Sequence, residues 1–139
     1  MSGVLLDTNV LSELIRKRPE KRVVDRALAL DPRDRWTSAI CLMELRAGAE
    51  RHPRGTAIWE RIAAEVLPLV RVAPVDEGTA LLAGRIVAKL ALAGTPIGVE
   101  DVLIGATAIH RRFRIATRNV KHLGRIDDLD VDDWWRPEP

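Results

Sequence analysis

The stretch from Val4 to Asn9 constrains the fold of this chain more than any other part of the sequence. Three apolar residues run directly into Asp7, Thr8 and Asn9, and apolar residues at helical spacing follow at once. This order predicts a short buried strand that ends in Asp7, followed by a helix. In open α/β sheets, ligands bind at the carboxyl ends of the strands. A carboxylate there either caps the helix or meets a partner such as a metal ion, and this stretch alone leaves both readings open.

The rest of the chain alternates between strand-like and helix-like apolar patterns. We expect further strands at 35–39, 69–76 and 113–119, with a last short strand near Val131. Apolar residues at helical spacing predict helices within 23–30, 40–49, 58–67, 81–91 and 98–109, and Ser38 is the expected N-cap of the second of these. Strands separated by helices imply an α/β fold whose mainly parallel sheet carries helices on both faces. The sequence shows no repeat and no linker, so we expect a single domain over residues 1–139.

Composition narrows the class of protein. The chain is 47% hydrophobic and 30% charged, as globular domains are. Its single cysteine, Cys41, excludes an internal disulfide, is expected to be a small buried residue, and fits a reducing, cytoplasmic setting. No signal peptide and no apolar run long enough to cross a membrane is expected. The net charge of +2 permits a polyanionic partner without requiring one.

Three acids stand out because each lies in strongly apolar sequence. Asp7 follows two leucines, Glu44 lies between a methionine and a leucine, and Asp101 precedes Val-Leu-Ile. Acids in such surroundings are uncommon unless they are paired or bind a cation. If the three share one cleft, they raise one another's pKa, and a hard cation such as Mg²⁺ relieves that repulsion. A metal held in this way can activate water and neutralise a phosphodiester, which suits the arginines gathered between residues 111 and 125.

Each of these features also has a plain structural explanation. Glu44 could pair with Arg46 or with an arginine of another helix, and Arg85 could likewise neutralise a buried acid. Asp101 could interact with the N-terminal dipole of its own helix. The three histidines have no metal-ligand spacing and are expected to be surface or packing residues. Trp134–Trp135 is expected to pack or to contact a partner rather than to stack on RNA, because its neighbours are acidic.

Four segments, taken in order, resemble the PIN-domain family, and more narrowly the VapC or FitB-type toxins of type II toxin–antitoxin systems. They are LLDTN at 5–9, SAICLMELRAG at 38–48, DVLIGATA at 101–108 and ATRN at 116–119. The resemblance covers nearly the whole chain. It implies a three-layer α/β/α PIN-like fold with a short, mainly parallel central sheet. It also implies a Mg²⁺-dependent endoribonuclease, with Mn²⁺ as the other candidate cofactor.

The resemblance also assigns roles to individual residues. By position, the catalytic and metal-binding acids are Asp7, Glu44 and Asp101. Thr8 matches a position that supports the first acid, and Asn119 matches a strand end that carries a further acid or an asparagine. Arg118, next to Asn119, is the arginine that we expect to hold a phosphate of the substrate.

Two positions depart from the family pattern. Where members commonly carry an acid followed by phenylalanine, this chain has His122 and Leu123. The departure leaves a fourth acidic ligand and a second metal site open, and it keeps a second function in view, a non-catalytic RNA- or protein-binding PIN-like module. A nucleotide-binding or phosphatase-like α/β domain is a third candidate, although the chain has neither a G-x-G-x-x-G nor a Walker A loop.

The resemblance implies partners as well. Family members commonly form homodimers, and a cognate antitoxin silences them by placing its tail in the active-site groove, in a heterotetramer or a larger assembly. An arginine in such a tail would suit a cluster of carboxylates. We expect dimer or antitoxin contacts at the apolar first helices, an RNA substrate, and no membrane partner.

Overall fold

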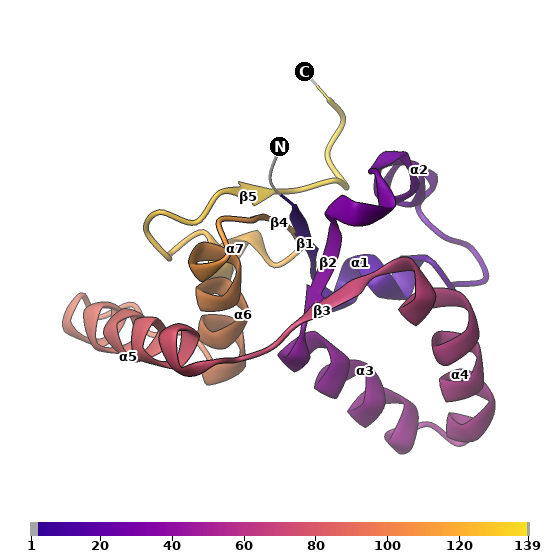
Figure 1. The fold of residues 1–139 in the computed structure, drawn as a ribbon, viewed down its shortest axis with the longest axis horizontal. Helices are drawn as coiled ribbons and strands as arrows, with labels where there is room; N and C mark the ends of the chain where they lie inside the picture. Colours follow the sequence, from indigo (N-terminus) through magenta and orange to yellow (C-terminus); the bar gives the residue numbers. More distant parts are fainter. Residues whose placement is uncertain (1–2, 139) are drawn as a thin grey trace.

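Five short strands form one parallel sheet with the first strand of the chain at its centre (Figure 1). The computed structural model describes residues 3–138. The strands are β1 (Val4–Leu6), β2 (Arg35–Ser38), β3 (Arg71–Ala73), β4 (Arg114–Ala116) and β5 (Val131–Asp132), in the order β3-β2-β1-β4-β5. Every neighbouring pair is parallel, as the sequence predicts. The strand expected over 69–76 is only three residues long because it lies between Pro68 and Pro74, and a proline cannot donate to a sheet ladder.

Helices connect the strands. They are α1 (Thr8–Glu13), α2 (Lys21–Ala29), α3 (Ala39–Arg51), α4 (Gly55–Arg61), α5 (Glu77–Leu92), α6 (Val99–His110) and α7 (Val120–Leu123). A short 3₁₀ turn precedes β2 at Pro32–Asp34. The helix expected over 58–67 is α4 continued by a π-helical turn (Ile62–Val66) and a 3₁₀ turn (Leu67–Leu69). The sequence did not predict α7, because four residues are too few to show a helical period.

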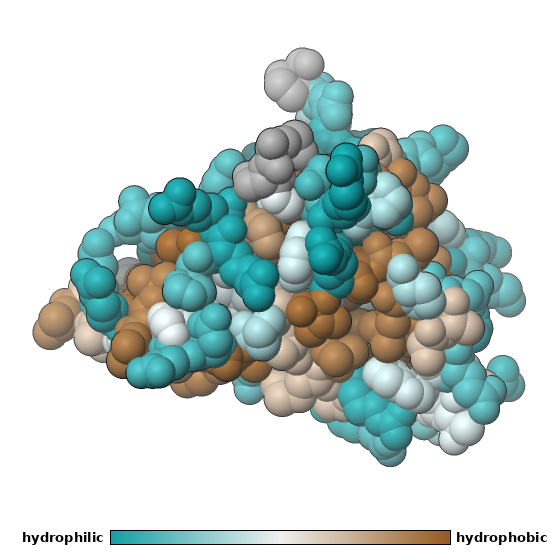
Figure 2. Space-filling view, viewed as in Figure 1, coloured by the Kyte–Doolittle hydropathy of each residue, from teal (hydrophilic) through white to brown (hydrophobic). Residues whose placement is uncertain are grey.

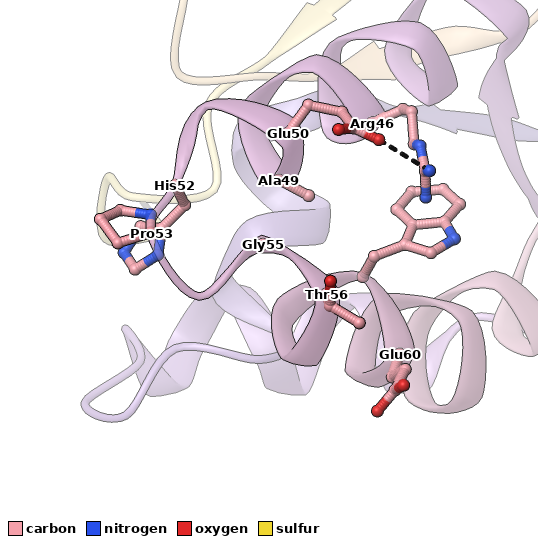
Figure 3. A pocket seen from close by; sticks show the side chains of 9 residues that line it. Arg46, Ala49, Glu50, His52, Pro53, Gly55, Thr56 and Glu60 are labelled. Atoms are coloured by element: carbon pink, nitrogen blue, oxygen red, sulfur yellow. Dashed lines mark ion pairs between the residues drawn. The ribbon is translucent and has the colours of Figure 1, made fainter.

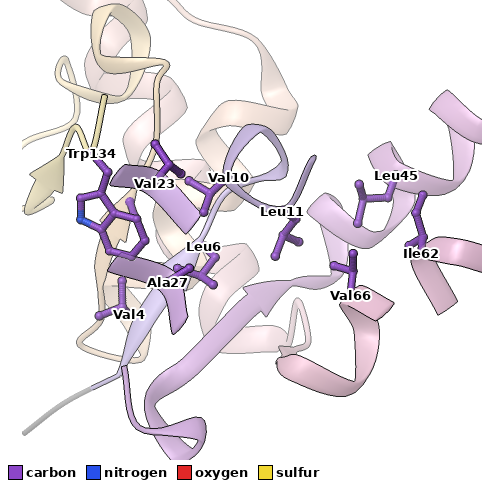
Figure 4. Packing of buried hydrophobic residues seen from close by; sticks show 11 residues of the cluster. Val4, Leu6, Val10, Leu11, Val23, Ala27, Leu45, Ile62, Val66 and Trp134 are labelled. Carbon is purple, nitrogen blue, oxygen red and sulfur yellow. The ribbon is translucent and has the colours of Figure 1, made fainter. Parts of the chain in front are cut away.

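Both faces of β1 are buried, which explains its three consecutive apolar residues. Val4 and Leu6 pack with α1, α2 and Trp134 on one face of the sheet (Figure 4). Leu5 points the other way and packs with apolar residues of α5 and α6. All three side chains of β1 are fully buried, and burying one such side chain is worth about 1.5–3 kcal/mol. The helices therefore form outer layers on both faces, which confirms the three-layer α/β/α fold.

The strand order determines where a ligand crevice forms. The chain builds β1, β2 and β3 outward in one direction, then crosses to the other side of β1 to form β4 and β5. In such sheets the crevice lies at the carboxyl ends of the two strands where the direction reverses. Here these strands are β1 and β4, and the residues that follow them are Asp7 and Thr117.

The surface combines charged and apolar side chains (Figure 2). Along α5 and at the start of α6, Leu81, Leu92 and Val99 are exposed, with 90% of Leu92 accessible to solvent. Apolar residues are also visible in Figure 2 at the end of the molecule where Figure 1 places α5. Among residues 3–138, none of the helices combines the length and the apolar character that a membrane span requires.

Candidate active site

Asp7 lies where the strand order places the crevice, directly after β1. Its backbone N–H donates to the carbonyl of Ala116, the last residue of β4, at 3.0 Å, so the two strand ends are joined at this point. Asp7 also precedes α1, and its Oδ1 accepts the backbone N–H of Thr8 at 2.8 Å. The capping reading of the sequence is therefore confirmed, and the same residue is the acid at the end of β1.

The Asp7 carboxylate is 5% exposed and is held by several donors. The Thr117 hydroxyl donates to Oδ2 at 2.6 Å, and the Asn9 side-chain amide approaches the same oxygen at 3.4 Å. The thiol of Cys41 lies 3.5 Å from Oδ1. Hydrogen bonds to a carboxylate are about twice as strong as bonds between neutral groups, so these contacts fix the orientation of Asp7.

Glu44 reaches the same place from α3. Ser38 caps this helix by accepting the Cys41 backbone N–H at 2.9 Å, as the sequence predicts. Residues three apart lie on one face of a helix, so Cys41 and Glu44 both face Asp7. The Thr8 hydroxyl donates to Glu44 Oε1 at 2.6 Å. One ligand atom each from Asp7, Cys41 and Glu44 lie within 4.8 Å of one another.

The surroundings change the acidity of two of these groups. Partial burial raises the pKa of Glu44, the negative charges of Asp7, Asp101 and Glu100 raise it further, and the Thr8 hydroxyl partly offsets the rise. Burial, and then the charge of Asp7, raise the pKa of the Cys41 thiol to about 11. Cys41 is therefore a neutral thiol at neutral pH.

Asp101 belongs to the same electrostatic neighbourhood but not to the tight cluster. It lies in the first turn of α6, and its charge acts on Glu44. Its Oδ2 lies 3.2 Å from Nδ1 of His122, whose ring is 42% exposed. His122 is thus a neighbour of one of the three acids, at the position where the family pattern commonly has an acid. The departure from the family pattern at position 122 was the sign in the sequence that this residue lies near the site. The spacing of the histidines along the chain did not reveal it.

The other predicted site residues follow β4. The Asn119 backbone N–H donates to the Thr117 hydroxyl at 2.9 Å, and the Arg118 N–H donates to the side-chain oxygen of Asn9 at 3.1 Å. The guanidinium of Arg118 lies over the ring of Trp135, 5.4 Å from its centre. This segment therefore joins the site through its backbone. The packing role expected of Trp135 agrees with this contact.

Thr117 and Asn9 are site residues to which the sequence reasoning gave no role in holding Asp7. Thr117 is fully buried and is 110 positions from Asp7 in the chain. Thr117 directly follows the apolar strand β4, just as Asp7 directly follows β1. The sequence therefore marks Thr117 as a strand-end residue, but it points to Asp7 only once β1 and β4 are known to be neighbours.

The arginines considered as partners of the acids bind elsewhere. Arg46 pairs with Glu50 at 2.7 Å and stacks over Trp59, at the edge of a separate pocket of about 380 Å³ between α3 and α4 (Figure 3). This corrects the expectation that Arg46 could neutralise Glu44, because Arg46 faces the next turn of its own helix. Arg85 forms no ion pair with any residue between 3 and 138.

The donor set fits a hard divalent cation. Within the described part of the chain, no lysine or arginine nitrogen lies within 4.0 Å of a carboxylate of Asp7, Glu44 or Asp101. Clustered carboxylates without a cationic side chain repel one another, and a divalent ion with oxygen ligands removes that repulsion. The residues present therefore suit such an ion.

Comparison with known proteins gives a consistent result. A profile of the PIN domain matches residues 4–129. The VapC ribonuclease Y4jK of Sinorhizobium fredii is 34% identical over 139 residues, covering 96% of this chain and 99% of that protein. Toxin FitB of Neisseria gonorrhoeae is 34% identical over 136 residues, covering 94% and 98%. The crystal structure of FitAcB from Neisseria gonorrhoeae superposes with a TM-score of 0.88 at 33% identity, covering 96% and 99%.

Proposed function

This chain belongs to the PIN domain family, and on that premise we propose that it is a metal-dependent endoribonuclease and the toxin of a type II toxin–antitoxin pair. The observation that carries the proposal is the cluster of Asp7 and Glu44, with Asp101 nearby and no lysine or arginine among the described residues bound to any of them. Two relatives that match this chain over nearly their full lengths are named a ribonuclease and a toxin, which supports the same assignment.

We assign the ion to Asp7, Glu44 and Asp101, with Mg²⁺ as the first candidate and Mn²⁺ as the second, because all three offer oxygen ligands. When bound, the ion supplies an activated water and offsets the negative charge that develops on the phosphodiester. Thr117 and the Thr8 backbone N–H orient Asp7, and the Thr8 hydroxyl orients Glu44. These hydrogen bonds leave the carboxylates little freedom to rotate, which lowers the entropy cost of binding the ion.

Substrate contacts are assigned to the segment after β4. Arg118 and Asn119 extend from the backbone that also positions Thr117, so they border the cluster. The Arg118 guanidinium, which stacks on Trp135, would contact a phosphate of the RNA, either from this position or after turning away from the ring. The Asn119 side chain, which makes no capping hydrogen bond, would hold a water or a substrate oxygen.

We propose that a cognate antitoxin silences this activity in the cytoplasm and that the toxin acts as a homodimer. The exposed apolar residues of α5 and α6 are of the kind that oligomer interfaces bury. This adds α5 and α6 to the first helices as candidates for the dimer contact, since Leu28 of α2 is also half exposed. The first helices remain candidates for antitoxin contact.

Calorimetric titration with Mg²⁺ and Mn²⁺ tests the metal site directly. Wild type is compared with Asp101→Asn and with Asp127→Asn, a matched variant of an exposed aspartate that pairs with Lys89. We expect binding by wild type and by Asp127→Asn, and binding weakened at least tenfold in Asp101→Asn, since a charged ligand is removed. Equal metal affinity in all three proteins would show that Asp101 does not bind the ion.

Cleavage of a labelled single-stranded RNA with Mg²⁺ or Mn²⁺ tests the activity. Asp7→Asn should keep the wild-type circular dichroism spectrum and lose cleavage. Undiminished metal-dependent cleavage by Asp7→Asn would exclude the proposed mechanism. Metal-independent RNA binding without cleavage would favour the non-catalytic module, and hydrolysis of p-nitrophenyl phosphate without RNA cleavage would favour a phosphatase-like domain.

A further inference from the structure

A cluster of arginines surrounds Trp36 at the amino edge of the sheet, the edge opposite the acids. Trp36 in β2 is the register partner of Arg71 in β3, so their side chains lie on the same face. The Arg71 guanidinium carbon is 4.8 Å from the centre of the Trp36 ring, and that of Arg111 is 4.9 Å away. Phe113 supports the indole with a centroid separation of 5.2 Å. We refer to Trp36, Arg71 and Arg111 as the Trp36 platform.

Among the described residues, the arginines of the platform have no acidic ion-pair partner. Among residues 3–138, no carboxylate oxygen lies within 4.0 Å of a guanidinium nitrogen of Arg71, Arg111 or Arg112. The backbone N–H of Thr79 lowers the pKa of Asp76 most, and the charge of Arg111 lowers it slightly further. The Asp76 carboxylate is not bound to Arg111, because its Oδ1 accepts the Thr79 backbone N–H at 2.8 Å and lies 3.5 Å from Nε2 of His110.

The two guanidinium groups repel each other. Both lie within 5 Å of one ring centre, so Arg71 and Arg111 are no more than about 10 Å apart. The screening length at physiological salt is about 8 Å, so salt screens part of this repulsion, and more of it the closer the separation is to 10 Å. Stacking on the indole offsets part of this repulsion, and an anion between them would offset more.

Arg112 directly follows Arg111 in the chain and is a further exposed cation, at a position where arginine is unfavourable. It follows the end of α6 with φ = 61°, and the bonds from Arg112 N to Ile109 O and from Phe113 N to Ala108 O form the helix-ending motif that normally has glycine at this place. An L-residue in this conformation is less stable than glycine. The chain therefore carries an exposed positive charge here at a cost to its own stability, which is typical of functional positions.

We propose that the Trp36 platform binds the phosphate backbone of single-stranded RNA at a segment outside the one that is cut. The identity of the polymer as RNA rests on the proposed function, whereas the preference for phosphates rests on the platform itself. Guanidinium groups stacked on an indole are pre-oriented and direct their N–H groups outward, as phosphate recognition requires. The strands between the two ends of the sheet span only three or four residues, so the platform and the acids are separated by roughly 10–13 Å along the strand direction.

Equilibrium binding without metal isolates this site from catalysis. A fluorescein-labelled single-stranded RNA is titrated in EDTA, with anisotropy as the signal, against wild type, Arg111→Gln and Arg51→Gln. Arg51 is a matched control because it is exposed and ends α3, a helix that starts at the opposite edge of the sheet. We expect Arg111→Gln to bind roughly three- to fivefold more weakly and Arg51→Gln to bind like wild type. The slope of log K against log salt should fall by about 0.7 for each phosphate that the variant no longer neutralises.

A second variant separates binding from folding. Arg112→Gly should weaken RNA binding while it raises the urea midpoint, because glycine suits the left-handed backbone. Equally weakened binding in Arg111→Gln and Arg51→Gln would show an effect of net charge alone and would overturn the proposal. Binding of poly-glutamate that depends on Arg111, without binding of RNA, would assign the platform to an acidic protein instead. RNA cleavage by wild type combined with unchanged binding by Arg111→Gln would refute the platform and leave the proposed function standing.

Discussion

The hydrogen bond from Thr117 to Asp7 gives the most direct test of how the site is built. Thr117→Val keeps the shape of the side chain and removes the hydroxyl that donates to Asp7 Oδ2 at 2.6 Å. Thr117 is fully buried and Asp7 is 5% exposed, so water cannot readily replace the missing donor. The same hydroxyl accepts the Asn119 backbone N–H at 2.9 Å, and the substitution leaves that N–H without its partner as well.

The expected cost follows from these two hydrogen bonds. A hydrogen bond to a charged group contributes about 1.5–3 kcal/mol, and an unsatisfied backbone N–H adds to the cost, so the free energy of unfolding should fall by about 2–4 kcal/mol. Domains of this size are stable by about 5–15 kcal/mol, so the variant should still fold. Urea unfolding followed by circular dichroism measures the change.

Thr107→Val is the matched control. Thr107 is also fully buried, but its hydroxyl donates to the neutral carbonyl of Leu103 in its own helix at 2.7 Å. This variant should be destabilised by only about 1 kcal/mol. A Thr117→Val protein that is no less stable than Thr107→Val would refute the role given to the Thr117 hydroxyl. Additive effects of Asp7→Asn and Thr117→Val in a double-mutant cycle would refute it too, because residues in one hydrogen-bonded network should couple.

Two further predictions concern the charges of the site. The raised pKa of Glu44 means that the folded state binds this proton more tightly than the unfolded state, so the stability of the metal-free protein should fall as the pH rises from 4.5 through that pKa. Urea unfolding in EDTA at a series of pH values should show the fall in wild type and a smaller one in Glu44→Gln, whereas parallel curves would contradict it. His122→Asp replaces the 3.2 Å contact between His122 and Asp101 with a like-charge pair. It should lower metal-free stability by about 1 kcal/mol and tighten Mg²⁺ binding by about tenfold, both relative to His52→Asp, an exposed histidine that lines the separate pocket between α3 and α4. Unchanged Mg²⁺ affinity in calorimetry would show that position 122 does not border the ion.

Much of the fold could be read from the sequence because its signals are local. The apolar run that ends in Asp7 predicts β1, and Ser38 before an apolar helical pattern predicts the start of α3. Both signals depend on residues a few positions apart, since burial has the period of the element and a cap binds the next turn. Where the local signal is short or mixed the prediction fails, as for the four residues of α7 and the π-helical turn after α4.

The candidate site could be read only in part. The apolar context of Asp7 and Glu44 marks acids that fold into the interior, and the structure brings both into one cluster. The sequence could not show that Cys41 shares this cluster or that His122 contacts Asp101. It left Arg46 open as a partner of Glu44, because charge and spacing allow several pairs and only packing selects one.

By itself, then, the sequence determined the strand–helix alternation, the acid at the end of the first strand and the residues that cap α1 and α3, since each depends on neighbours along the chain. The tertiary structure decided that β4 lies beside β1, and so that Thr117 holds Asp7 across 110 residues. It also placed Arg71 of β3 and Arg111, which follows α6, around Trp36, at the end of the sheet opposite the acids. Contacts of this kind depend on strand order and register, which are set by how all the apolar faces pack together at once, and no single stretch of the chain records that result.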